Sequence, residues 1–475
     1  MKKKSKKSVQ HPWYKRKRFL HFDFALKKPK AFEYVSDKKN IAKHNFSPLI
    51  HYTKTSRQYK RNKKTRKLHV HKKSRNIFYA SHVDGYVYSY CNYEISKKYE
   101  EYLEQNKLTK NVIAYRQIDK NGQGNSNIHF SKDAFEYIRS LPGCNVMCLD
   151  ITGFFDNLNV DILKKNWCRV YSNGKSNKLD DAHYNVFRSL KNFHYIEEND
   201  VIRVFGKEPR KRNKVDKSNK AARTDELNQS LYKRICNFSE LKQAKKSFAG
   251  EKGLVRRNSE LGISGIPQGT AISGLLSNIF MIDFDINIKS KVEKDGGFYR
   301  RYSDDIFIAF PKSVNSQDID KYVEEVLKEI SNDNLRINPK KTEKRTYGKD
   351  SKGLGAVYNE NGQPAKVQYL GFTFDGEKTH IRSSSISKNR SKISYVIRKN
   401  KKRKNKQTGM SNINTRKVYK AQSPRKITPS DKQENKGFVF YAKRAKDIQA
   451  SKAIGKQVKK NDRFIKNKIS EERKK

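Results

Sequence analysis

The chain has little acidic charge for its length. Its 475 residues include 49 Asp and Glu against 106 Lys and Arg, which leaves a formal net charge of +57. Such an excess attracts polyanions, and the resulting contacts with nucleic acid weaken as salt rises. An AT-rich genome accounts for part of the lysine, but mutational drift alone would not remove so many acidic residues. The composition therefore favours nucleic acid as a partner over an acidic membrane surface.

Cysteine and long apolar segments are also scarce. The five cysteines form no Cys-x-x-Cys pair, so the pattern predicts neither disulfides nor a zinc site. We expect Cys144 and Cys148, which flank or lie on a predicted buried strand, to be packing residues. No apolar run approaches the length of a membrane span, and the lysine-rich N-terminus lacks the hydrophobic stretch of a signal peptide. These absences predict a cytoplasmic protein with no membrane partner.

The most informative segment present is Tyr302-Ser303-Asp304-Asp305. Its flanks are rich in β-branched and aromatic residues, so residues 297–310 predict two strands joined by a tight turn. Adjacent carboxylates at a hairpin tip repel each other unless a cation lies near them. Acidic turns are common, but Mg²⁺ prefers one or two hard carboxylates together with substrate phosphates, so the pair indicates a metal site.

A third carboxylate ends a different apolar run. Residues 145–149 predict a buried strand that finishes at Asp150, and a helix is expected to begin near Asn159. Two-metal phosphoryl transfer needs carboxylates from separate strands around ions roughly 4 Å apart. Asp150 and an acidic pair on a neighbouring hairpin would supply that arrangement.

A glycine-rich turn lies between these acidic segments. Residues 265–270, Gly-Ile-Pro-Gln-Gly-Thr, precede an apolar-periodic segment that predicts a helix through Phe280. Such a turn lets the backbone approach a ligand closely, and the helix start that follows favours anions. A Gly-Pro turn is also common before a helix without any ligand.

In this order, the three segments resemble the palm domain of reverse transcriptases. The resemblance continues in residues 335–343, similar to the motif that brings a lysine near the triphosphate, and in residues 368–374, similar to the primer-grip hairpin. Residues 73–77 and 114–116 resemble, more faintly, the basic fingers motifs that hold the incoming triphosphate. The implied fold is α+β with right-hand polymerase architecture: fingers, an RRM-like palm of antiparallel sheet plus helices, and a helical thumb.

The resemblance also implies the metal ligands and cofactor. Asp150 and Asp304 would bind two Mg²⁺ ions, for which Mn²⁺ could substitute, with Asp305 as a third carboxylate nearby. Ile151 would add its backbone carbonyl. Lys341, or the adjacent Lys340, would protonate the leaving pyrophosphate.

Four further residues are implied to contact the nucleotide: Arg75, Arg116, Phe155 and Gln268. The two arginines would hold phosphates, and Gln268 would contact the incoming nucleotide. Phe155 occupies the position of a bulky ring under the sugar, where it would collide with a 2′-hydroxyl and favour deoxynucleotides. Because side chains alternate, we expect the neighbouring Phe154 to be the buried ring.

We divide the chain into six predicted parts: a basic N-terminal arm (1–60), fingers (61–145), the first part of the palm (146–170), a fingers or palm insertion (171–261), the second part of the palm with catalytic hairpin and primer grip (262–375), and a basic helical thumb (376–475). The rings of the arm, including Trp13, Phe22 and Phe24, suit stacking on single-stranded RNA, although its first residues also suit disorder. Residues 207–214 predict a polar loop against the template, and residues 399–431 a basic low-complexity loop.

Missing segments narrow the kind of enzyme. Residues after 375 lack the scattered carboxylates of RNase H, no Cys/His cluster of an HNH-type nuclease occurs, and the Asn-Ala-x-x-His and Val-Thr-Gly elements of retron enzymes are absent. Residues 265–273 and 441–445 resemble stand-alone bacterial reverse transcriptases related to abortive-infection proteins, which are related in turn to retron and group II intron enzymes. That kinship implies anti-phage defence.

The implied partners are an RNA template, here a structured non-coding RNA, deoxynucleoside triphosphates and the DNA product. The sequence leaves open whether copies of the chain associate. Two other functions remain. One is template-independent or protein-primed DNA synthesis, for which 26 tyrosines offer no unique primer. The other is a non-catalytic RNA-binding scaffold, which would have no chemical need for three aspartates together with Gln268.

Overall fold

The computed structural model describes residues 12–17, 19–61, 65, 68–120, 123–206, 234–248, 253–404, 410–422 and 437–474. The chain forms two compact units, each built from three chain segments. Unit 1 holds residues 1–116, 151–287 and 323–336, and unit 2 holds residues 117–150, 288–322 and 337–475. Among the described residues, none of the helices combines the length and apolar character that crossing a bilayer requires.

Unit 1 consists of helices around a small mixed sheet. Its elements are α1 (Lys28–Ser36), α2 (Lys38–Ala42), β1 (Leu49–Thr53), β2 (Ser56–Arg61), β3 (Leu68–Lys73), β4 (Asn76–Tyr79), α3 (His82–Gln105), η1 (Phe155–Asn157), α5 (Val160–Ser172), α6 (Asp181–Lys191), β8 (His194–Glu197), α7 (Glu198–Phe205), α9 (Phe238–Ser247), β9 (Arg256–Arg257), η2 (Asn258–Leu261) and α10 (Ser273–Phe280). The sheet order is β4-β1-β8-β9, with β1 and β8 parallel.

The predicted insertion at 171–261 is an integral part of unit 1. Its strand β8 pairs with β1, and Ile196 of β8 packs in a buried apolar cluster with Ile50 of β1 and with Val201 of α7. Burial of that apolar surface stabilises the unit, so this part of the insertion belongs to the core. The predicted polar loop at 207–214 lies outside the described residues.

The described residues of the N-terminal arm, from 12 onward, pack against the rest of unit 1. Trp13 is only 6% exposed and lies edge-on to Tyr90 at 5.5 Å between ring centroids, and Phe22 is fully buried. The Asp23 carboxylate accepts hydrogen bonds from two backbone N–H groups in the first turn of α3, including that of His82 at 2.9 Å. The prediction that these rings stack on RNA is therefore wrong for Trp13 and Phe22, because the core already covers them. Phe24 is 38% exposed.

Unit 2 contains the main sheet and a helical C-terminal part. Its elements are β5 (Asp119–Lys120), β6 (Gln123–Gly124), α4 (Asn127–Ser140), β7 (Cys144–Asp150), β10 (Phe298–Tyr302), β11 (Asp305–Pro311), β12 (Glu343–Lys349), β13 (Gly355–Tyr358), β14 (Val367–Tyr369), β15 (Phe372–Phe374), β16 (Thr379–Ile381), α13 (Ser383–Lys399), β17 (Lys401–Lys404), β18 (Ser411–Ile413), α14 (Thr415–Gln422), α15 (Phe438–Ile448) and α16 (Lys452–Lys474). Helices α11 (Ile282–Lys294) and α12 (Ser316–Ser331) contribute to both units.

The main sheet is antiparallel, in the order β10-β11-β7-β12-β13. Helix α4 packs on it through Tyr137, whose ring stacks on Phe298 of β10 with centroids 4.9 Å apart. Phe135 of the same helix stacks on Phe374 of β15 at 5.2 Å. This sheet and its helix confirm the expected palm of antiparallel strands plus helices.

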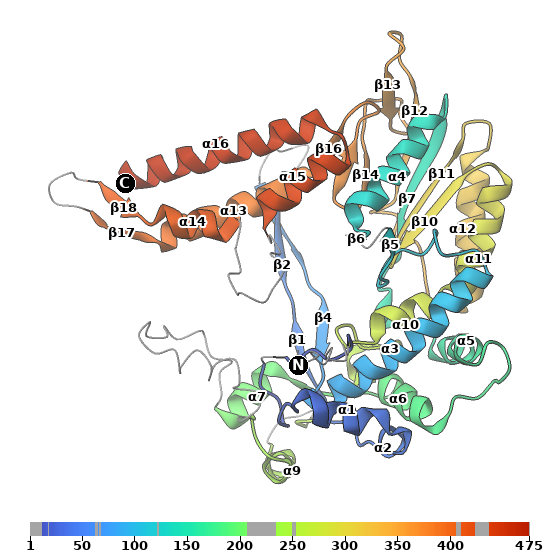
Figure 1. Cartoon of the computed structure of the whole chain (residues 1–475), viewed down its shortest axis with the longest axis vertical. Helices are drawn as coiled ribbons and strands as arrows, with labels where there is room; N and C mark the ends of the chain where they lie inside the picture. Colours follow the sequence, from blue (N-terminus) through green and yellow to red (C-terminus); the bar gives the residue numbers. More distant parts are fainter. Residues whose placement is uncertain are drawn as a thin grey trace, which may run out of the picture. The chain divides into compact units, whose positions relative to one another are not determined.

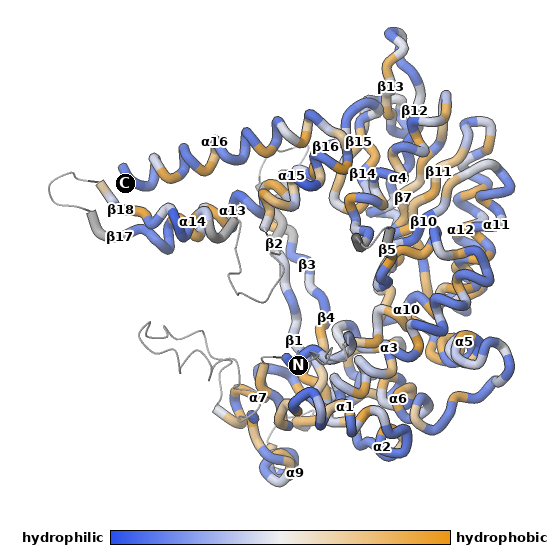
Figure 2. The backbone as a smooth tube through the Cα atoms, viewed as in Figure 1, coloured by the Kyte–Doolittle hydropathy of each residue, from blue (hydrophilic) through white to orange (hydrophobic). Residues whose placement is uncertain are grey.

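The C-terminal part of unit 2 has its own apolar core. Helices α13 and α16 run side by side (Figure 1), and Figure 2 shows apolar stretches recurring along α16 between hydrophilic ones. The core residues are Ile393, Ile397, Ile413, Val418, Ile465 and Ile469. Of the predicted basic loop at 399–431, the described residues form strands β17 and β18 and helix α14, and residues 405–409 and 423–431 lie outside the described part of the chain. Single apolar residues such as Ile413 anchor these elements, because their side chains pack in the core against residues distant in sequence.

Candidate active site

The acidic hairpin has the tight turn predicted from sequence. Tyr302 pairs with Asp305 across β10 and β11, which leaves Ser303 and Asp304 as the turn residues. Ser303 has a left-handed φ of 61°, the conformation that two-residue hairpin turns require at their first position. Its side chain is buried, with 3% exposed. The fully buried Arg301 donates from Nη1 to the Ser303 carbonyl at 3.1 Å. Sequence reasoning missed Arg301; its signal was a charged residue at an inward-facing position of a strand.

Asp150 lies directly opposite Asp305. Strand β7 runs antiparallel to β11 with these two residues in register, at the strand end expected for Asp150. Directly opposed residues in such a pair have Cα atoms about 4.5–5.5 Å apart. Loss of hydration and the charges of Asp304 and Asp150 raise the pKa of Asp305 to about 6, although its side chain keeps exposed surface. The three carboxylates therefore share one electrostatic environment.

Lys341 provides the cation nearest to Asp150. Its Nζ forms an ion pair with Oδ2 of Asp150, and the Asn338 N–H donates to the Asp150 carbonyl at 2.7 Å. The Asn338 side chain in turn accepts from the Lys340 N–H at 3.1 Å, which holds the loop in a tight turn. Of the two lysines that the sequence left open, the structure directs Lys341 toward the carboxylates.

A buried tyrosine packs against strand β11 of the hairpin. Tyr369 is 4% exposed and its ring lies 4.6 Å from that of Phe307 on β11. Burial, and secondarily the charge of Asp305, raise the pKa of Tyr369 well above its ordinary value. The charge of Arg382 acts in the opposite direction on Asp305. Tyr369 lies in the segment that resembles the primer grip. Its electrostatic interaction with Asp305, and that of Arg382 with Asp305, were not predicted.

In unit 1, the Pro-Gln-Gly loop has a fixed backbone. The Gln268 carbonyl accepts from the Phe78 N–H at 2.9 Å, and the Ser273 hydroxyl donates to the Pro267 carbonyl at 2.7 Å. Gly269 has a φ of 123°, and a Cβ there would lie 2.4 Å from the Phe78 carbonyl oxygen. Only glycine fits this approach. The Gln268 side chain is half-buried, so its contact with a nucleotide remains a prediction.

Phe155 lies on η1 against the same loop. A Cβ on Gly265 would stand 2.1 Å from the Phe155 carbonyl oxygen, and that oxygen accepts from the Ile266 N–H at 3.0 Å. Phe154 is 4% exposed, whereas Phe155 is half-buried. The prediction that Phe154 is the buried ring is confirmed, but its reason was wrong: Phe154 has helical backbone angles before η1, so the two rings do not alternate as in a strand. Ile151 is buried, and the role of its carbonyl stays a prediction.

The two predicted phosphate-binding arginines differ. The side chain of Arg116 is 1% exposed, donates from Nε to Glu100 at 2.8 Å, and also donates to the Thr109 carbonyl at 2.9 Å. It thereby fastens α3 to the loop that follows, which contradicts a phosphate-binding role. Arg75 pairs through its backbone with Lys54, and its side chain is exposed.

The acidic residues have the chemistry that divalent metal ions require. Carboxylate oxygens are the ligands Mg²⁺ prefers, and the mutual repulsion felt by Asp305 is what a cation would relieve. Within the described residues, no group of three or more His, Cys, Asp or Glu side chains is arranged to hold an ion as it stands. The Lys341 ammonium instead lies on Asp150. Asp150, Asp304 and Asp305 are the residues that would hold the metal.

We expect Asp305→Asn to raise the melting temperature of the metal-free protein at neutral pH by roughly 1–3 °C. The pKa of Asp305, about 6 in the folded chain, exceeds the ordinary aspartate value of 3.8. The stability that this shift adds is present below pH 3.8 and is lost as the pH rises through about 6. Solvent screening of the exposed side chain keeps the effect small.

Thermal unfolding in chelator, at mildly acidic and neutral pH, measures this effect. The advantage of Asp305→Asn should shrink toward zero on acidification, and adding Mg²⁺ should stabilise the wild type more than the variant. A variant that melts no higher than the wild type at neutral pH would show that the carboxylates do not repel each other.

Residues 232–374 match the family model described as "Reverse transcriptase (RNA-dependent DNA polymerase)". No curated protein matches the chain. Among solved structures, the chain is similar to telomerase from Candida albicans in complex with a TWJ fragment of telomeric RNA, with 12% identity, a TM-score of 0.37, and coverage of 78% of this chain and 53% of that one. The chain is also similar to apo telomerase from Candida tropicalis, with 13% identity, a TM-score of 0.37, and coverage of 78% of this chain and 57% of that one.

The chain thus spans little more than half the length of these telomerase chains, and at such TM-scores the likeness adds nothing on function. The family match has more weight, because its segment includes both the Pro-Gln-Gly loop and the Asp304–Asp305 hairpin described above. Residues 232–374 therefore match a reverse-transcriptase domain, and the chain has an α+β fold of the right-hand polymerase type.

Proposed function

We propose that this chain synthesises DNA on an RNA template by two-metal nucleotidyl transfer. The observation that supports this most directly is the register of β7 and β11, which places Asp150 opposite Asp305, with Asp304 in the adjoining turn. The family match at 232–374 agrees with the RNA-directed class. A non-catalytic scaffold would gain nothing from this repulsion between carboxylates.

Each residue has a defined task in this proposal. Bound at Asp150, Asp304 and Asp305, two divalent ions would lower the pKa of a primer 3′-hydroxyl and offset charge on the triphosphate. Lys341 supplies a positive charge beside Asp150 and would donate a proton to the departing pyrophosphate. Gln268 would contact the incoming nucleotide from a rigid backbone, and positioning of this kind supplies part of the rate.

The direct test is DNA synthesis by the purified chain with Mg²⁺ or Mn²⁺, deoxynucleotides, and a set of RNA templates with and without primer. Sequencing of the product names template and primer together. DNA copied from the RNA supports the proposal. DNA made without template, or attached covalently to the protein, would favour the template-independent or protein-primed alternative.

We predict that Phe155→Ala admits ribonucleotides, with discrimination falling by at least about tenfold, roughly 1.4 kcal/mol. The half-buried ring has exposed surface to offer a sugar, and removing it leaves space for a 2′-hydroxyl. The measurement is the ratio of kcat/KM for deoxy- and ribonucleotides. Phe187→Ala, which removes a buried ring of α6 in the same unit, is the matched control: it should cost about 3 kcal/mol of stability and leave the ratio unchanged. An unchanged ratio in Phe155→Ala would refute the sugar-contact assignment.

We further propose that the template is a structured non-coding RNA and that the product serves anti-phage defence. The support is the resemblance of residues 265–273 and 441–445 to abortive-infection-related enzymes. In the structure, Ala442 and Ala445 are fully buried, and the Tyr441 hydroxyl accepts from Asn127 Nδ2 at 3.1 Å, so this segment has a packing role. Plaque counts on host cells carrying wild type or Asp304→Ala test the defence role: equal counts would contradict it.

A further inference from the structure

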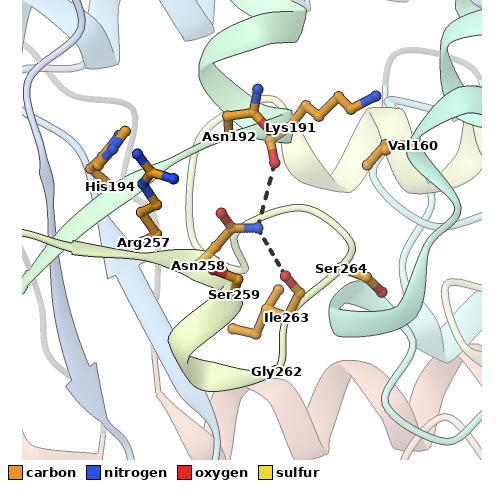
Figure 3. A pocket seen from close by; sticks show the side chains of 10 residues that line it. All are labelled: Val160, Lys191, Asn192, His194, Arg257, Asn258, Ser259, Gly262, Ile263 and Ser264. Carbon is orange, nitrogen blue, oxygen red and sulfur yellow. Dashed lines mark hydrogen bonds between the residues drawn. The ribbon is translucent and has the colours of Figure 1, made fainter.

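A cavity of about 770 Å³ opens in unit 1 (Figure 3). The acidic hairpin belongs to unit 2, and none of its residues lines the cavity. Its walls come from the start of α5, the end of α6, strands β8 and β9, η2 and the loop that follows η2. The lining residues are Val160, Lys191, Asn192, His194, Arg257, Asn258, Ser259, Gly262, Ile263 and Ser264. Its volume falls in the range of sites that hold nucleotide-sized ligands.

The lining of this cavity is basic and polar. Three of its residues are Lys191, His194 and Arg257, and none is Asp or Glu. Lys191 shares its charge with Asp161, 2.9 Å away, but among the described residues no carboxylate forms an ion pair with Arg257. Partial burial and the positive charges of Arg257 and Lys245 lower the pKa of His194. The Glu260 carboxylate accepts from the Arg257 backbone N–H at 2.9 Å, but the Arg257 guanidinium keeps a positive charge at the cavity that an anion would offset.

The walls are held in place by the protein's own hydrogen bonds. His194 and Arg257 are paired residues of neighbouring strands and lie side by side in Figure 3. The Asn258 carboxamide donates to the Ile263 carbonyl at 2.8 Å and to the Lys191 carbonyl at 3.4 Å, which ties η2 to α6. A preformed site of this kind loses little entropy when a ligand binds.

Ser264, the last lining residue in the chain, is followed directly by the loop that carries Gln268. Beyond Ser264, the Gly265 N–H donates to the Asp156 carbonyl at 2.8 Å, and the Ser264 N–H donates to the same oxygen at 3.0 Å. The next residues are the Pro-Gln-Gly segment. A ligand in the cavity would thus touch the chain segment that fixes both η1 and that loop.

We propose that this cavity binds a phosphorylated nucleotide unit, with Arg257 facing the phosphate and Asn192, Ser259 and Ser264 available for sugar and base. The same chemistry has two sources, a unit of a single-stranded nucleic acid or a free nucleotide. Cationic and amide groups arranged around a nucleotide-sized space are what such a ligand requires. The site is independent of the catalytic proposal, since none of its lining residues has a role there.

Photo-cross-linking tests this site without any need for polymerase activity. The full chain is irradiated in chelator with a short oligouridylate that carries 4-thiouridine or, in a second arm, with 4-thiouridine monophosphate, and cross-linked peptides are mapped by mass spectrometry. We expect cross-links in residues 191–194 or 257–264. Arg257→Ala should lower their yield at least about tenfold, Arg257→Lys should restore part of it, and Arg188→Ala, an exposed arginine on α6 outside the lining, should leave it unchanged.

The two arms identify the source of the nucleotide. Cross-links from the oligonucleotide alone assign the cavity to a strand, and cross-links from the monophosphate assign it to a free nucleotide. Absence of cross-links at these peptides in both arms, or a yield that Arg257→Ala leaves unchanged, overturns the proposal. Because the measurement is made without metal ions or synthesis, its failure says nothing against the polymerase, and failure of the polymerase says nothing against it.

Discussion

Replacement of Asp304 and Asp305 by alanine should reduce DNA synthesis by at least about 10³-fold, roughly 4 kcal/mol of transition-state stabilisation. Both lie on the hairpin whose second strand is in register with Asp150, so their removal deletes most of the acidic charge at that position. Two-metal catalysis depends on that charge, because the ions clamp the attacking and leaving oxygens. Primer extension with Mg²⁺ and with Mn²⁺ measures the loss.

The fold should survive these substitutions. Arg301 holds the turn through the Ser303 carbonyl, which the double variant retains. The strands pair through backbone groups, which the substitutions do not change. RNA affinity should change by less than about twofold, since phosphate contacts come from Lys and Arg. Asp133→Ala, a carboxylate outside the sheet on α4, is the matched control and should keep full activity. Normal incorporation by the Asp304/Asp305 double variant would refute the polymerase assignment.

Affinity for a structured partner RNA should fall by roughly 10³-fold between 50 and 200 mM salt if six or more phosphates are engaged. The structure shows where part of the charge is displayed. Lys388, Lys392 and Lys399 are exposed on α13 at spacings of four and seven residues, which places them on one face. Tyr395, 59% exposed, lies between the last two on that face, and the Lys399 ammonium is 5.9 Å from its ring centroid. Such a stripe suits phosphates and an unstacked base.

Alanine at these three lysines should reduce the slope of log affinity against log salt by about 2–3. Removing Lys110, Lys175 and Lys178, which are exposed in unit 1, removes equal charge and serves as the control. Deletion of the extreme N-terminus should stop at residue 11, because Trp13 belongs to the core. Sequencing of RNA bound in the native host should recover one dominant species. Random cellular RNA in every preparation would instead mean that the charge is non-specific.

Much of the active site could be predicted because its signals are local. The hairpin at 298–311 follows from alternating strand residues around a two-residue turn, and the strand that ends at Asp150 follows from its apolar run. The burial of Phe154 rather than Phe155 was also predicted, although these residues form a turn and a 3-10 helix and not an alternating strand. The glycine-rich turn at 265–270 was predicted to let the backbone approach a ligand; in the structure Gly269 instead lies against the Phe78 backbone, 2.4 Å from where a Cβ would stand.

Errors arose where a residue's partner is distant in the chain or hidden by composition. Arg116 looked like a phosphate ligand in so basic a sequence, but Glu100, one helix earlier, takes its guanidinium into the interior. Trp13 and Phe22 looked like RNA-stacking rings, but α3 and β1 supply apolar surface that covers them. Burying a ring in the core is worth about 1.5–3 kcal/mol, and no local pattern shows whether that surface exists.

The sequence by itself determined the positions of the three aspartates, the tight acidic turn, the glycine-dependent loop and the strongly basic character of the chain. These follow from backbone geometry and charge, which each short segment carries within it. Only the tertiary structure decided that Asp150 is opposite Asp305, that Lys341 rather than Lys340 lies on Asp150, and that a basic cavity forms behind residues 257–264. Strand register, ion pairing and cavities depend on which distant segments meet, and that is set by the burial of the whole core.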